Sequence, residues 1–386
     1  MTLIYDDMLV KSLKRIYGDD IHKFFEAIQR PSSRLYVRVN KLKISVDELI
    51  KSLKDKGFEV YRDEYVEEAI YFPVKGPNKI PSARKVVIAD KQASESVLLG
   101  SHLYAPGIVK ADDFSKGEEI NVVTQYTGRV IAYGIAVMDY DEVIRRRRGL
   151  AIKILKSLYE APRIRELPEF KLGYIYPQSY PAIITSRFLT PQEGDVIVDM
   201  CAAPGGKTGH LVELSNGKAA IYAFDHSKSK LQRMIKELRR LGHLDKVKIY
   251  KADSRYLDVD YSWLKPNKVL LDPPCSALGV RPKVYDKKSY SEVINNVNYQ
   301  WQFMKVALGI VRKGGLVLYS TCTVTCEENE EIIERAIRKL RAEPIRIDFP
   351  RASRGVCGLE VDDYVIRFHP HVHDTTGYFI ALIKKS

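Results

Sequence analysis

The chain has 386 residues, of which 45% are hydrophobic and 29% charged, enough apolar material for two or three domains with buried cores. This composition excludes a wholly disordered protein. Lysine and arginine exceed aspartate and glutamate by 13, and so large a positive excess favours a polyanionic partner such as nucleic acid. A basic, well-solvated surface without such a partner is the alternative.

The sequence shows no sign of a membrane or secreted location. No apolar run approaches the roughly 18 residues that cross a bilayer, so we expect no membrane partner. The start of the chain lacks a basic region followed by an apolar one, so we expect no secretory signal. Five cysteines do not make the even set of a disulfide framework. We therefore expect a cytoplasmic protein with reduced cysteines, and we take it to be a monomer.

The first 82 residues combine helices and strands. Apolar residues recur at helical spacing over the first 30 residues, and Gly18 divides this stretch. The alternation at 34–39 predicts a strand, and Ser45 with Glu48 predicts the capping box of a further helix. We expect a small α+β module. Its strand lacks the aromatic consensus that stacks on RNA bases, so we expect it to act as a spacer or packing wall.

A glycine and two prolines at 75–84 mark a boundary. Beyond it lie short strand-like segments separated by turn signals, the pattern of a compact β-barrel, to which we assign residues 83–160. The barrel contains the densest positive run of the chain, formed by Arg145, Arg146, Arg147 and Arg148. We expect residues 161–190 to complete the N-terminal module and to link it onward.

From Asp195 strands alternate with helices, which predicts βαβ units and a mainly parallel sheet covered on both faces. We expect one α/β domain over residues 191–386. The predicted strands are 196–200, 220–225, 247–250, 268–272, 315–320 and 378–383. The predicted helices are 206–214, 228–241, 292–311 and 327–340.

A candidate cofactor loop follows the strand 196–200. It reads Cys-Ala-Ala-Pro-Gly-Gly-Lys-Thr over 201–208 and opens a helix, whose N-terminus can hold an anionic ligand group. Asp199 lies beside the loop, and Asp225 ends the next strand, where it can accept hydrogen bonds from ribose hydroxyls. The loop fits neither common phosphate-binding pattern. A nucleoside cofactor without a pyrophosphate, such as S-adenosylmethionine, is therefore favoured over a plain strand-to-helix turn.

Two cysteines follow predicted strands at the same edge of the sheet. Cys275 comes after Asp272 and two prolines, and Cys322 comes after a Ser-Thr pair. A thiolate at such a site becomes a nucleophile when nearby positive charge lowers its pKa. Free cysteines are otherwise small buried apolar residues, which is our prediction for the remaining thiols of Cys201, Cys326 and Cys357.

A metal site is an alternative use of some of these residues. Cys322 and Cys326 have a plausible ligand spacing, and His369, His371 and His373 alternate as they would along one side of a strand. Zinc needs four such ligands held together. We expect Cys326 to start a helix directed away from the sheet edge and the histidines to lie in a loop before the last strand. We therefore predict no metal, and the histidines then shape the pocket wall or have no role.

Three motifs carry a family resemblance. DMCAAPGGKT at 199–208, DPPCS at 272–276 and STCT at 320–323 resemble the Sun-domain (NOL/NOP/Sun) family of RNA cytosine-5 methyltransferases. The similarity extends from about residue 178 to the end, and GSHLYAPGIV at 100–109 resembles a PUA domain. The resemblance implies a class I (Rossmann-like) SAM-dependent methyltransferase domain with an α+β RRM-like N-terminal module and an inserted β-barrel PUA domain. Members of this kind methylate tRNA cytosine 72, beside the CCA end.

The resemblance also implies a role for each motif residue. Cys322 would attack cytosine C6, Cys275 would assist removal of the C5 proton, and Asp272 would hydrogen-bond the protonated N3 and the exocyclic amine. The charge of Lys207 would favour the thiolate. The loop would hold the methionine part of the cofactor, Asp225 the ribose and Asp253 the adenine amino group. The expected cofactor-binding residues are Cys201, Ala202, Ala203, Pro204, Gly205, Gly206, Lys207, Asp225, Lys230, Asp253 and Asp272.

The expected partner is tRNA, held at its acceptor stem and CCA end by the PUA domain and the arginine run 145–148. An acceptor-stem cytosine is paired, so the enzyme must open it. An rRNA cytosine-5 methyltransferase is one alternative. A non-catalytic tRNA-binding protein with a degenerate methyltransferase fold is another, although both motif cysteines, Asp225, Asp272 and Lys207 are present.

Overall fold

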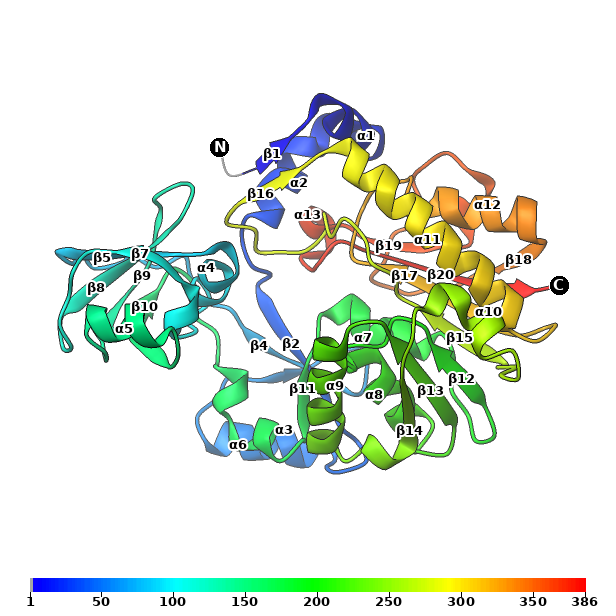
Figure 1. Cartoon of the computed structure of the whole chain (residues 1–386), viewed down its shortest axis with the longest axis horizontal. Coiled ribbons are helices and arrows are strands. Elements are labelled where there is room, and N and C mark those ends of the chain that lie inside the picture. The colour runs from blue at the N-terminus through cyan, green and yellow to red at the C-terminus, as the bar shows by residue number, and fades with distance from the viewer. Residues whose placement is uncertain (1–2) are drawn as a thin grey trace.

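The computed structural model describes residues 3–386, and its largest sheet runs through the C-terminal half of the chain (Figure 1). The eight strands follow the order β14-β13-β12-β15-β17-β20-β18, with β19 paired to β20. The first five of these are parallel, while β20 is antiparallel to β17. The strands are β12 (Val196–Asp199), β13 (Ala220–Asp225), β14 (Val247–Lys251), β15 (Lys268–Leu271), β17 (Leu316–Thr321), β18 (Ala342–Ile345), β19 (Ile366–Phe368) and β20 (Tyr378–Lys385). The six predicted strands are confirmed.

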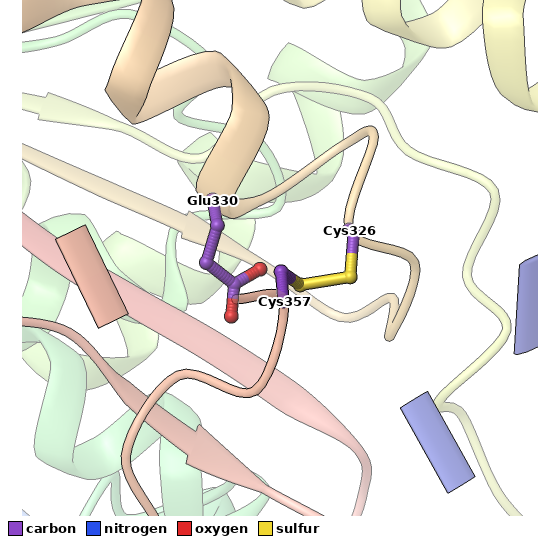
Figure 2. A group of neighbouring side chains, drawn as sticks. All are labelled: Cys326, Glu330 and Cys357. Carbon is purple, nitrogen blue, oxygen red and sulfur yellow. A yellow bond between two sulfur atoms is a disulfide. The ribbon is translucent and has the colours of Figure 1, made fainter. Parts of the chain in front are cut away.

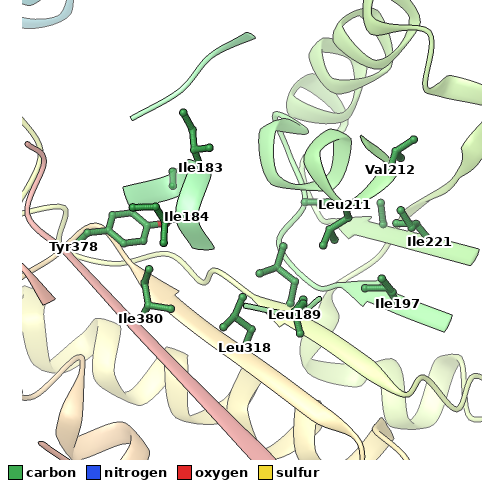
Figure 3. Close-up of a cluster of buried hydrophobic side chains, with 14 of the residues drawn as sticks. Ile183, Ile184, Leu189, Ile197, Leu211, Val212, Ile221, Leu318, Tyr378 and Ile380 are labelled. Atoms are coloured by element: carbon green, nitrogen blue, oxygen red, sulfur yellow. The ribbon is translucent and has the colours of Figure 1, made fainter. Parts of the chain in front are cut away.

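Helices cover both faces of this sheet because alternate strand residues point to opposite sides. Ile197 and Leu318 belong to the core under α7, α8 and α9, and part of this core is shown in Figure 3. Val198 and Val317 belong to the core under α11 and α12. The helices are α7 (Tyr180–Arg187), α8 (Gly206–Leu214), α9 (Lys228–Leu241), α10 (Leu257–Asp260), α11 (Tyr290–Ile310), α12 (Glu330–Leu340) and α13 (Pro370–His373). Among residues 3–386, no helix is both long and apolar enough to cross a membrane.

A second sheet belongs to the N-terminal module. It is antiparallel, with the order β11-β2-β4-β3, and α3 starts with the predicted capping box of Ser45 and Glu48. Because β11 follows the barrel in sequence but pairs with β2, the barrel is inserted into this module. The elements are β2 (Arg34–Val39), α3 (Val46–Asp55), β3 (Tyr61–Arg62), β4 (Ala69–Pro73), α6 (Pro168–Lys171) and β11 (Ile175–Pro177).

The first two helices, α1 (Asp7–Tyr17) and α2 (Ile21–Ile28), separate at Gly18 as predicted. They pack on a core that includes Leu278, Val293 and Val324 of the C-terminal domain. Before them, β1 (Leu3–Tyr5) pairs in parallel with β16 (Asp286–Lys288). The N-terminal helices thereby cover the segments that follow both motif cysteines.

The inserted barrel forms a separate lobe in Figure 1. Its six strands follow the order β6-β10-β9-β8-β5-β7, and the predicted short strands are present. The elements are β5 (Lys85–Ala89), α4 (Lys91–Val97), β6 (Leu103–Tyr104), β7 (Ile108–Ala111), β8 (Glu119–Thr124), β9 (Val130–Ala136), α5 (Tyr140–Arg146) and β10 (Leu150–Ser157). The sequence patterns did not predict α4, which starts at the Asp90 cap.

Two local predictions about the C-terminal domain are wrong. His371 and His373 do not lie in a loop, because Pro370 takes the first position of the short helix α13, and His369 directly precedes this helix as its N-cap. Cys326 does not start a helix, since α12 begins at Glu330. Proline is favoured at a helix start, so His371 and His373 lie on a helical turn and the three histidines do not share one side of a strand.

Candidate active site

The cofactor loop lies where β12 ends and α8 begins, as predicted. Gly205 caps α8 with a φ of 99°, a left-handed conformation that favours glycine. A Cβ atom on Gly205 would lie 2.9 Å from Met234, and one on Gly206 would lie 2.8 Å from the ring of Tyr176. Both glycines therefore allow the loop to pack tightly between α9 and β11.

Two cavities flank the loop, and both are lined by Cys201 and Asp272. The first, of 220 Å³, brings together the predicted residues Asp225, Lys230, Asp253, Cys275 and Cys322. The second, of 200 Å³, is lined by the predicted loop residues Ala202, Pro204, Gly206 and Lys207, and by the unpredicted Tyr176 and Gln178. Ala203 and Gly205 line neither cavity.

The carboxylates of the first cavity differ in their partners. Asp225 is 6% exposed and accepts a hydrogen bond of 2.8 Å from the backbone N–H of Ser227. Asp253 is half-buried and forms an ion pair of 2.6 Å with Arg255. The hydrogen bond from Arg255 lowers the pKa of Asp253. Asp253 therefore lines the cavity as an ionised carboxylate whose orientation is fixed by Arg255.

The two motif thiols meet at the first cavity. The sulfur atoms of Cys275 and Cys322 lie 3.4 Å apart, and both residues are half-buried. The hydrogen bond from Cys275 lowers the pKa of Cys322 against the effect of burial, and the charge of Lys207 acts in the same direction. The same hydrogen bond, with burial, raises the pKa of Cys275. Cys322 is therefore the sulfur that more readily carries negative charge.

Asp272 joins the thiol pair to the cofactor loop. Its Oδ2 lies 2.5 Å from Nζ of Lys207, and its Oδ1 accepts hydrogen bonds from Ser320 at 2.8 Å and from Tyr378 at 3.4 Å. Burial lowers the pKa of Lys207, but the nearby Asp272 carboxylate raises it by more, so the pKa of Lys207 lies above its usual value. Lys207 is therefore charged, and the contacts of Asp272 fix the orientation of both groups.

The motif patterns missed Glu328, which fixes the loops of both thiols. Its buried carboxylate accepts hydrogen bonds from the backbone N–H of Ser276 at 2.8 Å, from Gln300 at 3.0 Å and from Thr325 at 3.0 Å. Ser276 follows Cys275, and Thr325 lies in the loop after Cys322. Burial raises the pKa of Glu328. The sequence offered one signal for this role, namely an acidic residue shortly after the STCT motif.

Asp199 is a buried carboxylate at the wall of the second cavity. Its Oδ2 accepts a hydrogen bond of 2.7 Å from Thr208, while its Oδ1 has no partner among the described residues. Burial raises the pKa of Asp199 to about 7, despite the hydrogen bond from Thr208. A buried acceptor without a partner is costly, so the carboxylate is available to a donor group of a ligand.

The N-terminal module supplies a second residue that the sequence patterns missed. Arg38 on β2 is fully buried, and its guanidinium donates hydrogen bonds to Glu213 of α8 at 2.7 and 3.0 Å. It also donates to the carbonyl oxygen of Gly206 at 2.7 Å and to the side chain of Gln178. Arg38 therefore holds the cofactor loop and the wall of the second cavity.

The arginine run lies at the end of α5 in the barrel lobe (Figure 1), and none of its residues lines either cavity. Arg146 pairs with Glu142 one turn earlier on α5. Arg147 donates to the carbonyl oxygen of Ile108 at 2.8 Å, so its guanidinium serves the barrel itself. Within the described part of the chain, Arg145 and Arg148 pair with no other side chain.

The expectation of five reduced cysteines is wrong. Cys326 and Cys357 form a disulfide across 31 residues of sequence, and Cys201, Cys275 and Cys322 are free (Figure 2). Cys357 lies after β18 and is brought beside the loop that follows Cys322, where Cys326 lies. The spacing of the cysteines in the sequence does not reveal this long-range contact. Glu330 lies next to the two sulfurs, but a disulfide leaves no thiolate to bind a metal ion.

The fold is that of a class I, Rossmann-like methyltransferase. The sheet is mainly parallel, a glycine-containing loop leads into α8, and the carboxylate of Asp225 lies at the end of β13. The sequence family described as 16S rRNA methyltransferase RsmB/F matches residues 186–384. A PUA domain matches residues 85–158, and an RsmF/B-like ferredoxin-like domain matches residues 5–77.

Two curated relatives are similar over most of the chain. The tRNA (cytosine(72)-C(5))-methyltransferase of Pyrococcus horikoshii is 39% identical over 100% of this chain and 99% of its own. Human tRNA (cytosine(72)-C(5))-methyltransferase NSUN6 is 29% identical over 81% of this chain and 74% of its own. A crystal structure of NSun6 from Pyrococcus horikoshii with SFG superimposes with a TM-score of 0.90, at 39% identity, over 99% of this chain and 98% of that one. The chain belongs to the RsmB/F family, the Sun-domain methyltransferases that its motifs resemble.

Proposed function

We propose that this protein is an S-adenosylmethionine-dependent tRNA methyltransferase that forms 5-methylcytosine at position 72 of the acceptor stem. The observation that carries the proposal is the 3.4 Å approach of Cys275 and Cys322 beside Asp272. Two converging thiols suit a reaction in which one sulfur forms a covalent bond and another group helps to break it. A degenerate, non-catalytic fold would have no reason to retain this arrangement.

The residues of the two cavities fit the cofactor. When bound, S-adenosylmethionine supplies an electrophilic methyl group to a carbon nucleophile. Asp225 offers acceptors to a ribose, and Asp253 offers them to an adenine amino group. The loop 201–207 would hold the amino-acid part, for which the unpartnered Oδ1 of Asp199 is a suitable acceptor. Lys230 lines the first cavity and would be a weaker contact.

The chain's own residues support the following steps. The Cys322 thiolate attacks C6 of cytosine while a proton from solvent is taken up at N3, which neutralises the negative charge that develops on the ring. Asp272 accepts hydrogen bonds from this protonated N3 and from the exocyclic amine. The ring electrons move to C5, which takes the methyl group, and the electrons of the broken S–C bond remain on the sulfur of the leaving thioether. Cys275 then assists loss of the C5 proton, the bond between Cys322 and C6 breaks, and the ring loses the N3 proton and regains its aromaticity. Lys207 balances the charge of Asp272 and favours the Cys322 thiolate.

We assign tRNA binding to the barrel, because it matches the PUA domain and carries exposed arginines. Arg145 and Arg148 are the members of the run that remain available for phosphate contacts. The RsmB/F family description names 16S rRNA, so an rRNA substrate is the second candidate. The similarity to two position-72 enzymes favours tRNA.

The proposal is tested by incubating the protein and S-adenosylmethionine with tRNA transcripts that contain or lack the CCA end, followed by bisulfite sequencing. We expect modification at cytosine 72 only when the CCA end is present. Methylation of an rRNA fragment, with none of tRNA, would reject the tRNA assignment and leave the chemistry intact.

A further inference from the structure

The segment 279–288 leads from the Cys275 motif toward α11, and its start is fixed to the second thiol loop. The backbone N–H of Gly279 donates to the carbonyl oxygen of Cys322 at 3.1 Å. Gly377, just before β20, donates to the carbonyl oxygen of Gly279 at 2.8 Å. A Cβ atom on Gly279 would lie 2.3 Å from the Gly377 carbonyl oxygen, so only glycine permits this approach. The segment therefore leaves the active site from a defined point.

The middle of the segment is fixed by Arg281, whose side chain is 3% exposed. Its guanidinium donates four hydrogen bonds of 2.9 to 3.1 Å to residues on both sides of the segment, namely Arg30, Pro31, Pro370 and Asp374. The next contact comes from the backbone N–H of Lys283, which donates to the carbonyl oxygen of Ile28 at 2.7 Å. These contacts join the segment to the end of α2 and to α13.

The far end of the segment lies in the PUA barrel. Val284 is 8% exposed and belongs to the hydrophobic core of the barrel. Tyr285 stacks on Tyr126, in the turn between β8 and β9, with ring centroids 3.8 Å apart. Val284 and Tyr285, which belong to the C-terminal domain in sequence, therefore pack directly against the barrel.

Asp286 ties the same end to two further elements. Its carboxylate accepts hydrogen bonds from Lys91 of α4 at 2.8 Å and from Tyr5 of β1 at 3.0 Å, and Lys283 lies 2.9 Å away. The carboxylate side chain is only 3% exposed, so these interactions are little weakened by solvent. Asp286 thus joins the barrel, the N-terminal strand and the segment at one buried point.

We infer that residues 279–288 are a rigid spacer between the PUA barrel and the thiol pair, and that their contacts with the barrel determine which cytosine reaches Cys322. The inference rests on the proposed function, in which the barrel holds the 3′ end of the RNA. A base bound at a fixed distance from that end enters the active site only if the barrel keeps its position. A displacement of about 1 Å can reduce a rate by about 100-fold.

The test uses the double variant Lys91→Ala/Tyr285→Ala, which removes the Lys91–Asp286 ion pair and the stacking of Tyr285 on Tyr126 and leaves Val284 and Asp286 in place. Lys287→Ala is the matched control, because Lys287 is exposed and adjacent to Asp286 but makes none of these contacts. Small-angle X-ray scattering reads the barrel position without any substrate. We expect the wild type and the control to match this structure and the double variant to have a larger radius of gyration.

The second readout is a methylation map on a tRNA with cytosines at positions 71, 72 and 73. We expect the wild type and Lys287→Ala to modify only cytosine 72. The double variant should lose about tenfold or more of this rate and modify neighbouring cytosines, with unchanged affinity for S-adenosylmethionine. Unchanged scattering together with an unchanged map would overturn the inference. If the wild type modifies no tRNA, the proposed function fails, while scattering still decides whether the segment holds the barrel.

Discussion

The ammonium group of Lys207 lies 2.5 Å from the carboxylate of Asp272, and both groups line the cavity between the cofactor loop and β11. Lys207 opens α8, whereas Asp272 follows β15, so two adjacent strands of the sheet bring the pair together. The positive charge of Lys207 helps the hydrogen bond from Cys275 to lower the pKa of Cys322, whereas the Asp272 carboxylate acts in the opposite direction. Lys207 therefore acts on both the Asp272 carboxylate and the Cys322 thiol.

Replacing this lysine should shift the pH dependence of the reaction. Lys207→Met removes the positive charge, so the pKa of Cys322 rises and a smaller fraction is thiolate at neutral pH. We expect the acidic limb of the kcat profile to move to higher pH and kcat to fall about 100-fold. Lys207→Arg keeps the positive charge, so the acidic limb of its kcat profile should stay at the wild-type pH, although kcat should be lower. A Lys207→Met profile with the wild-type limb would show that the lysine does not act on the thiol.

A second prediction concerns Arg38, which reaches the cofactor loop from the N-terminal module. Arg38→Met leaves Glu213 buried without its partner and should lower the free energy of unfolding by about 3–5 kcal/mol. The double variant Arg38→Met/Glu213→Leu should recover most of that stability, because an apolar pair replaces the ion pair. It should still bind S-adenosylmethionine about tenfold more weakly, since Gly206 has lost its hydrogen bond. Calorimetry measures the affinity and urea unfolding the stability.

The control for this prediction is Lys41→Ala in the same module, which removes only an exposed pair with Glu67. Exposed pairs contribute about 0–1 kcal/mol, so little change is expected. Wild-type cofactor affinity in the stable double variant would contradict a positioning role for Arg38.

A third prediction concerns the disulfide between Cys326 and Cys357. Denatured, unreduced protein should show three reactive thiols, from Cys201, Cys275 and Cys322, and reduced protein five. The variant Cys326→Ala/Cys357→Ala should lose about 2–4 kcal/mol of stability, because the bond closes a loop of 31 residues in the unfolded chain. Methyl transfer should continue, since neither sulfur lines the cavities. Five reactive thiols before reduction would contradict the assignment.

A fourth prediction follows from Asp199. Its folded pKa of about 7 exceeds the ordinary value of 3.8, so the folded protein binds this proton more tightly than the unfolded chain does. The resulting loss of stability is absent below about pH 4, grows between pH 4 and 7, and is complete above pH 7. Asp199→Asn should therefore be more stable than the cofactor-free wild type by about 2–4 kcal/mol at pH 8 and by little at pH 4. Equal differences at both pH values would refute this.

Much of the site could be predicted because its residues follow strands of one sheet. The loop 201–208, Asp225, Asp272 and the two motif cysteines lie at or just beyond strand ends, and parallel strands bring such positions to one edge. Helix boundaries were also readable where a local signal exists, as at Ser45 and Gly18. These features depend on short-range sequence.

The rest depends on contacts between distant parts of the chain. Arg38 meets Gly206 across 168 residues, and Cys326 meets Cys357 through the return of β18 and its following loop. Neither partner is marked by spacing or composition. The loop expected at the histidines is a different case, because Pro370 starts a short helix there and is itself a local signal. The long-range contacts are decided by packing, which residue spacing in a single sequence does not reveal.

The most direct test of the central claim is the covalent RNA adduct. Cys275→Ala, incubated with tRNA and S-adenosylmethionine, should accumulate a protein–RNA species that survives denaturing electrophoresis, because the sulfur of Cys322 bonds to C6 and its release is slowed. Cys322→Ala should give neither adduct nor 5-methylcytosine. An adduct in Cys322→Ala and none in Cys275→Ala would assign the nucleophile to Cys275 and contradict the account.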